Sequence, residues 1–240
     1  MDPGGGGFSP GHSLGATGTR KVADLPSRTI KVAVEASPRR VFVWAVDWPG
    51  WCRSGRDRKS ALEALETYGE RYAPVAEAAG LEFAHGGPKF VTVTEVEGGT
   101  GTDFGIPSVI TDDDRRAVTP AQAKRLAAIV TSSWTLFDQV AGAAPEVLRK
   151  GPRGGGRDTS RIMAHVDEAD SAYAREIGIK NKPPGDRAAV EALRAEVLGV
   201  LGQPSGGQPL AMRKWPQRYA VRRIAWHALD HAWEIEDRSE

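Results

Sequence analysis

Two spacings of hydrophobic residues divide the chain. Apolar and polar residues alternate over 29–34 and 40–47, which is the period-two pattern of half-buried strands, and 36–39 predicts a hairpin turn between them. A helix is predicted from a capping box at Ser60-Ala-Leu-Glu63 to Gly80, and strand patterns return at 81–83 and 89–96. This half therefore predicts a small antiparallel β-sheet covered by a single helix.

From Thr119 the apolar spacing becomes helical and stays so. Thr119-Pro120-Ala-Gln122 combines an N-cap, a proline at the first helical position and a capping-box glutamine. Four amphipathic helices are expected, over about 119–142, 158–178, 186–201 and 216–237. They predict a four-helix up-and-down bundle, with crossover connections as the alternative, and the whole chain is therefore expected to be α+β.

Composition marks the segments outside these two regions. Residues 1–24 are rich in glycine, serine and proline and predict a disordered tail, and 98–117 mix glycines with a charged run and predict a linker or draped loop. The expected domains are then 25–97, for the sheet and its helix, and 118–240, for the bundle.

Charge, cysteine content and hydropathy limit the partners and compartments that the protein could have. The 32 basic residues nearly balance the 31 acidic ones, so no nucleic-acid partner is expected. The single cysteine, Cys52, excludes an intramolecular disulfide and fits a cytoplasmic protein. No apolar run approaches the roughly 18 residues of a membrane span, so no membrane association is expected.

Three of the five histidines fall where a metal site would need them. His227 and His231 are four residues apart in the last predicted helix, on its apolar stripe, so both imidazoles leave the same face. His165 lies on or beside the apolar stripe of the second predicted helix. The alternative is that each is a core histidine satisfied by a hydrogen bond.

Aromatic residues suggest interfaces. Trp48-Pro-Gly-Trp-Cys-Arg-Ser-Gly55 predicts a rigid loop, either a packed turn or a roof over a pocket in the next domain with Cys52 or His85 nearby. Tyr219, Trp226 and Trp233 recur at seven-residue intervals on the last helix, which indicates packing against the other domain or against a second subunit in a homodimer.

With its histidine pattern, 119–237 resembles the DinB/YfiT-like superfamily of metal-binding four-helix bundles. The resemblance implies that His165, together with His227 and His231 in Trp226-His-Ala-Leu-Asp-His231, binds a divalent metal ion, of which zinc and nickel are the expected identities. It also implies a thiol S-transferase whose metal activates a low-molecular-weight thiol, such as mycothiol, for attack on an electrophilic substrate.

Two carboxylates near the histidines are candidates for catalysis. Glu234 and Glu168 lie close in sequence to His231 and His165, and each is a candidate fourth ligand, outer hydrogen-bond acceptor or general base. Arg161 and Arg223 lie one helical turn from the histidines and suit either a substrate carboxylate or surface ion pairs.

The first half resembles a different family. Two strands ending in Asp47-Trp-Pro-Gly50, a charged loop and a helix opening with Ser60-Ala-Leu-Glu-Ala-Leu65 resemble the HicB-like antitoxin fold. That resemblance implies the second functional hypothesis, a non-enzymatic protein-binding module whose bundle site holds a structural metal or is vestigial. Access to the metal distinguishes the two hypotheses, since a plugged fourth position would favour the binding module.

Overall fold

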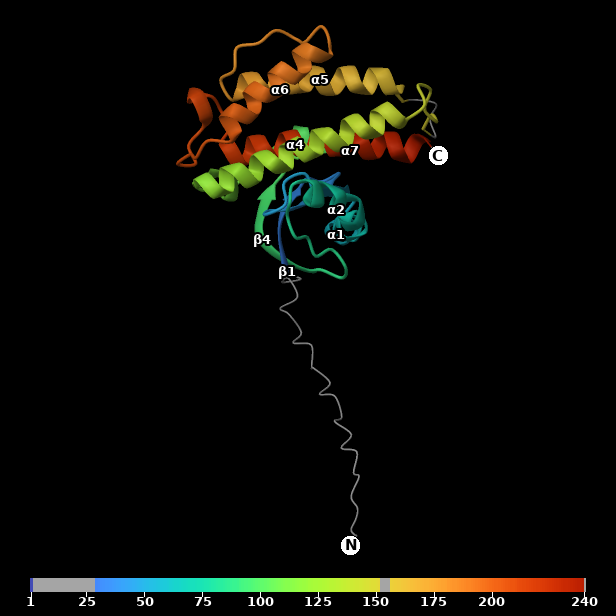
Figure 1. Cartoon of the computed structure of the whole chain (residues 1–240), viewed down its shortest axis with the longest axis vertical. Helices are drawn as coiled ribbons and strands as arrows, with labels where there is room; N and C mark the ends of the chain where they lie inside the picture. Colours follow the sequence, from blue (N-terminus) through green and yellow to red (C-terminus); the bar gives the residue numbers. More distant parts are fainter. Residues whose placement is uncertain (2–28, 152–155, 240) are drawn as a thin grey trace.

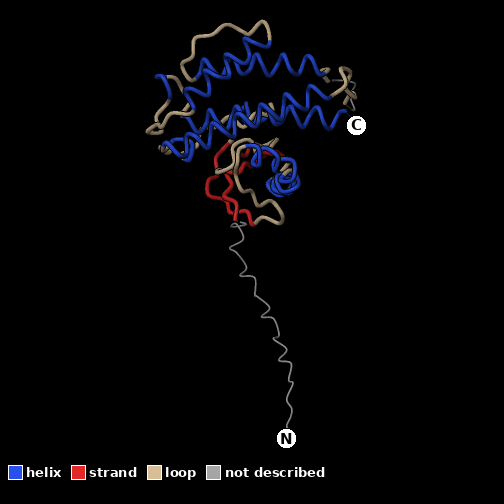
Figure 2. The backbone as a smooth tube through the Cα atoms, viewed as in Figure 1, coloured by secondary structure: helices blue, strands red, loops and turns tan. Residues whose placement is uncertain are grey.

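A four-stranded sheet is the first structural unit in the described part of the chain. The structure is a computed structural model that describes Met1, 29–151 and 156–239, so 2–24 of the predicted disordered tail lie outside the described residues. The strands, in the spatial order β3-β2-β1-β4, are β1 (Thr29–Ala36), β2 (Val41–Ala45), β3 (Cys52–Gly55) and β4 (Lys89–Glu97). The predicted α+β class is confirmed: a sheet comes first and long helices follow (Figures 1 and 2).

The expectation of a purely antiparallel sheet is wrong. β1 pairs with β2, and β2 with β3, in antiparallel fashion, but β4 lies parallel to β1 at the opposite edge from β3. The chain crosses from one edge of the sheet to the other through two helices, which returns it in the direction of β1. β3 was predicted as loop because it contains only one apolar residue, and 81–83, predicted as a strand, is irregular.

The predicted single helix is two helices, α1 (Arg58–Thr67) and α2 (Gly69–Ala78). They meet at Gly69, where the side chains of Trp51 and His85 approach so closely that a Cβ atom would lie 3.3 and 3.2 Å from them. The N-cap of α1 is Asp57 rather than Ser60: the Asp57 carboxylate accepts from the Ser60 backbone N–H. Proline in α2, at Pro74, also removes one helical hydrogen bond.

Both faces of the sheet are covered, so the alternating pattern of β1 gives way to continuous burial from Val32 to Glu35. α1 and α2 cover the face that carries Val32 and Val34. The other face, with Ala33 and Phe42, packs against Trp226 of the last helix, α7 (Gln217–Ser239).

Four long helices follow the sheet: α4 (Pro120–Ala143), α5 (Thr159–Glu176), α6 (Arg187–Leu201) and α7. α4 and α7 form a layer against the sheet, and α5 and α6 form an outer layer on top of them (Figure 1). An apolar core unites all four. None of the helices in the described ranges is long and apolar enough to cross a membrane.

The helices do not alternate in direction, so the up-and-down order is wrong. Backbone hydrogen bonds from Val118 to Ser205 place the start of α4 beside the end of α6, and those from Arg149 to Arg238 and from Thr159 to Glu146 place the ends of α4 and α7 beside the start of α5. α4 and α7 thus run one way and α5 and α6 the other (Figure 1). The segment between α5 and α6 returns along the length of the helices, which makes these two parallel.

The segment 98–117, predicted as a linker, is pinned at two buried points. Glu35 of β1 is fully buried and accepts hydrogen bonds from the Thr102 hydroxyl and from the backbone N–H groups of Ser108 and Val109. Farther along, Asp114 forms a buried ion pair with Arg222 of α7, at 2.8 Å. The segment also contains two short helices, α3 (Thr100–Asp103) and a 3₁₀ helix (Asp113–Arg115). Through its two buried contacts it fixes the sheet to α7.

We expect Asp114→Ala to destabilise the protein by about 3–5 kcal/mol, because it leaves the Arg222 guanidinium buried without its anion. Lys59→Ala, which removes an exposed pair with Glu63, is the control and should change stability by less than about 1 kcal/mol. Urea unfolding measures both values. Equal effects of the two substitutions would show that the Asp114–Arg222 pair does not hold the two parts together.

Candidate metal centre

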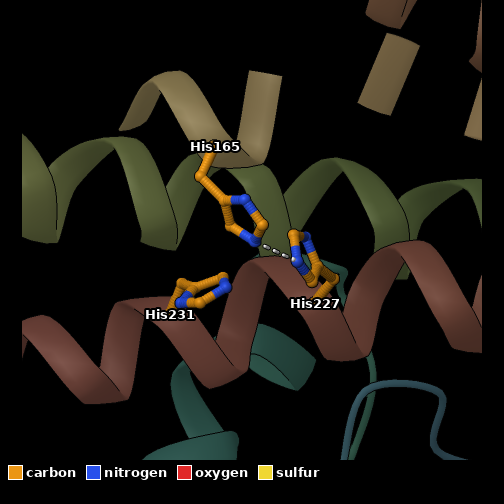
Figure 3. Close-up of side chains that lie close together, drawn as sticks. All are labelled: His165, His227 and His231. Carbon is orange, nitrogen blue, oxygen red and sulfur yellow. Dashed lines mark hydrogen bonds between the residues drawn. The ribbon is translucent and has the colours of Figure 1, made fainter. Parts of the chain in front are cut away.

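The two faces of α7 have different partners. Ala225, Leu229 and Trp233 pack into the core of the sheet domain, whereas Ile224, Ala228 and Ile235 belong to the core shared by the four helices. His227 and His231 project on the side of α7 that faces α5, away from the sheet domain (Figure 3). Both are buried, with exposed fractions of 6% and 7%.

His165 approaches them from α5. Its helix begins where the Thr159 hydroxyl donates to the carbonyl of Pro145, and Ile162 and Val166 bury its apolar stripe. That anchoring points the half-buried His165 ring at α7 (Figure 3). The three rings lie with their centroids 4.6–5.0 Å apart.

The spacing of the ring nitrogens suits a single ion. One nitrogen from each of the three histidines can be chosen so that all lie within 4.8 Å of one another, and the Nε2 atoms of His165 and His227 are 3.2 Å apart. Imidazole nitrogens that share a tetrahedral zinc ion, at bond lengths of 2.0–2.1 Å, lie about 3.3 Å apart. Small side-chain adjustments would therefore let all three bind one ion.

Glu234 fixes the tautomer of His231. Its Oε2 atom lies 2.8 Å from Nδ1 of His231, so that nitrogen carries the proton and donates, and Nε2 is left with a free lone pair. Arg238, one turn later, donates to the other carboxylate oxygen. This carboxylate–histidine pair is the arrangement that commonly orients a metal-binding imidazole. Among the three roles considered for Glu234, the geometry matches the outer hydrogen-bond acceptor.

Two of the three histidines, His165 and His227, have lowered pKa values. Burial lowers the pKa of His227 well below its ordinary value, and the neighbouring His231 and Arg223 lower it further. Burial and Arg157 likewise lower the pKa of His165. For Glu234, burial alone would raise the pKa, but the hydrogen bond and charge interaction with His231, together with Arg157 and Arg238, lower the pKa below its ordinary value. The lowered pKa values favour the neutral, metal-binding form of His165 and His227 and the ionised form of the Glu234 carboxylate.

Hydrogen bonds do not give every ring nitrogen of the histidine cluster a partner. Nδ1 of His227 is buried and has no hydrogen-bond partner among the described residues. Its Nε2 faces only the Nε2 of His165. An ordinary core histidine would have a donor or acceptor on each nitrogen, so the arrangement differs from the alternative of three satisfied core histidines.

Glu168 and Asp230 lie apart from the cluster. Glu168 is exposed and lines a groove between α5 and the start of α6, together with Pro183, Pro184 and Val190. Its charge still raises the pKa of His165, and its catalytic role stays a prediction. Asp230 forms an ion pair with Arg53 of the sheet domain, at 2.8 Å, and so faces away from the histidines.

The loop 48–52 packs as a turn and does not roof the histidines. Trp51 is fully buried and stacks on Tyr72, and Gly50 adopts a positive φ of 94° where a Cβ atom would lie 2.7 Å from Leu229. Cys52 is buried too, and burial raises the pKa of its thiol, which makes it a poor nucleophile. His85 stacks on Phe83 in the same aromatic group. All of these contacts lie on the sheet side of α7.

The aromatic stripe of α7 forms the interface within the chain. Trp226 meets Phe42 edge-on, Trp233 meets Tyr68, and the Tyr219 hydroxyl donates to the carbonyl of Ser108. Packing against the other domain is therefore the correct one of the two alternatives for this stripe. Because this stripe is buried within the chain, it no longer supports the predicted homodimer, which stays a prediction.

The sequence did not identify one neighbour of the site. Tyr173 of α5 was not singled out in the sequence, but its ring lies 5.6 Å from that of His227. Its position two turns after His165 on the same helix was the signal available. Arg223, by contrast, was recognised as lying one turn from His227, and it is buried rather than in a surface ion pair.

We expect the metal-free protein to take up about one equivalent of zinc or nickel, and His227→Ala to abolish this uptake by removing the buried central ligand. Asp230→Asn is the matched control on the same helix and should retain full uptake. Metal content after gel filtration, determined by mass spectrometry on untagged protein, measures both. Absence of metal in the wild type, or equal content in His227→Ala, would contradict the site.

Glu234→Gln should weaken metal affinity about 10- to 100-fold while leaving the stoichiometry at one, because the amide orients His231 less well and makes it less basic. Competition with a chromophoric chelator gives the affinity. Unchanged affinity would mean that Glu234 does not act through His231.

Comparison with known proteins identified no similar protein. No family model, no curated protein and no solved structure matches the chain. What the protein does must therefore be inferred from its own residues and their geometry.

Proposed function

We propose that the protein is a divalent-metal-dependent enzyme of the DinB/YfiT-like type, in which the four helices form the metal-binding bundle. The observation that carries the proposal is the convergence of His165, His227 and His231 within 4.8 Å without a fourth protein ligand among the described residues. Structural zinc sites have four protein ligands, whereas catalytic sites keep one position for water or substrate.

The surroundings of the histidines support an open position. The sheet domain packs on the opposite face of α7 through Leu229 and Trp233, so it does not cover the histidines. His165 is only half-buried, which gives access from the α5 side. This placement favours an enzyme over the alternative of a protein-binding module with a sealed structural metal.

The chemistry follows from the ligand set. A zinc or nickel ion held by three neutral imidazoles lowers the pKa of a water or thiol bound to it. Glu234, by accepting the proton of His231, keeps that imidazole aligned and basic. We propose a low-molecular-weight, mycothiol-like thiol as the co-substrate and an electrophile as the second substrate. Glu168, exposed on α5 three residues after His165, is the candidate proton acceptor.

The same proposal extends to the setting of the protein. A reaction with a reduced cellular thiol suits the cytoplasm, and the single buried Cys52 needs no oxidising compartment. The sheet domain, which we propose to be HicB-like, then serves to brace α7.

We expect the zinc- or nickel-loaded protein to accelerate conjugation of mycothiol-like thiols to a chromogenic aryl halide, and His231→Ala to lower this rate at least 100-fold. Asp230→Asn, the control, should stay within about twofold of the wild type. The rate is followed by absorbance with metal-loaded and metal-free protein side by side. Equal rates with and without metal would contradict metal-dependent thiol activation.

A further inference from the structure

Three arginines are buried among the described residues, and only two of them have anionic partners. Arg194, Arg222 and Arg223 are 6%, 5% and 7% exposed. Arg194 pairs with Asp138 and Asp170, and Arg222 pairs with Asp114. A buried guanidinium is costly unless a carboxylate or several hydrogen bonds compensate for its lost water.

Arg223 has no carboxylate partner within the described residues. A side-chain hydrogen bond links it to the neutral Tyr173 hydroxyl, and its Nη1 atom is buried without a partner. Its guanidinium carbon lies 4.7 Å from the ring centroid of Trp226 and 5.4 Å from that of Tyr173. These rings hold the guanidinium in place but supply no negative charge.

The position of Arg223 links it to the histidines. It lies one helical turn before His227 on α7, and Tyr173 contacts both residues, with its ring 5.6 Å from that of His227. Tyr173 is also close enough for Arg223 to lower the pKa of its hydroxyl against the burial that raises it. A guanidinium and a hydroxyl therefore lie together beside the metal centre.

We propose that Arg223 and the Tyr173 hydroxyl form a carboxylate-binding subsite, so that a substrate of this centre carries a carboxylate near the atom that meets the metal. This inference rests on the proposed function, which supplies the metal. The planar guanidinium suits a carboxylate because its parallel N–H groups match the two oxygens. The carboxylate belongs either to the thiol or to the electrophile.

Two pairs of probes distinguish these sources in the cobalt-substituted protein, whose absorption reports thiolate binding. The first pair is 3-mercaptopropionate and 3-mercapto-1-propanol, which differ only in the carboxylate. The second compares succinate with 1,4-butanediol in the presence of saturating 3-mercapto-1-propanol. We expect the carboxylate to bind about 10- to 100-fold more tightly than its neutral partner in at least one pair. The pair that shows the preference identifies the substrate that carries the group.

Variants test whether Arg223 is responsible. Arg223→Met should abolish the preference for the carboxylate without changing cobalt content, and Arg223→Lys should retain part of it. Arg161→Met is the matched control, since Arg161 is exposed and lies one turn from His165, and it should keep the full preference.

The outcomes separate the two proposals. Neutral and anionic probes that bind equally well in the wild type would overturn the subsite while leaving thiol binding at the metal intact, and this comparison needs no variant to fold. A preference that persists in folded Arg223→Met would overturn the role of Arg223. Failure of the wild type to bind cobalt or any thiol would overturn both the subsite and the proposed function.

Discussion

Burial of α7 on both sides is the constraint on which the rest of the structure depends. One side of the helix presents Leu229 and Trp233 to the sheet domain, and the other presents Ile224 and Ala228 to the neighbouring helices. A helix packed on both sides has little freedom to rotate or slide, because each side chain fills a space between its neighbours. The positions of His227 and His231 follow from this packing.

That rigidity would matter for the proposed metal centre, whose histidines come from two helices. The ligand geometry must be maintained to within a few tenths of an ångström, and His165 reaches the site from α5 only as long as α5 and α7 keep their separation. The Asp114–Arg222 pair and the aromatic stripe fix α7 from the sheet side. Glu234 and Arg238 then complete the support within α7 itself. The sheet domain thus contributes to the site without touching the histidines.

Local signals predicted well wherever they alone determine structure. Thr119-Pro120 and Asp186 sit at helix starts, as their capping chemistry indicates, and the i, i+4 spacing placed His227 and His231 on one face. The parallel pairing of β4 and the direction of α6 depend instead on where long connections return, which local spacing does not encode. β3, with its single apolar residue, is a strand because β2 offers it backbone partners.

The convergence of the three histidines was predictable from the sequence, and their surroundings were less so. The role of Glu234 follows from its i, i+3 spacing to His231 once both lie on one helix. The burial of Arg223 without an anion depends on what α5 and α7 place around it, and only three-dimensional packing reveals it. The Asp114–Arg222 pair joins residues 108 positions apart, beyond the reach of any local pattern.

The X-ray absorption spectrum of the zinc-loaded protein, recorded with and without a small thiol, tests the central claim most directly. Three imidazole nitrogens and one oxygen at about 2.0–2.1 Å are predicted without thiol, and replacement of the oxygen by sulfur at about 2.3 Å is predicted with it. Fewer than three imidazoles, or a ligand shell that does not change when thiol is added, would contradict an open three-histidine centre.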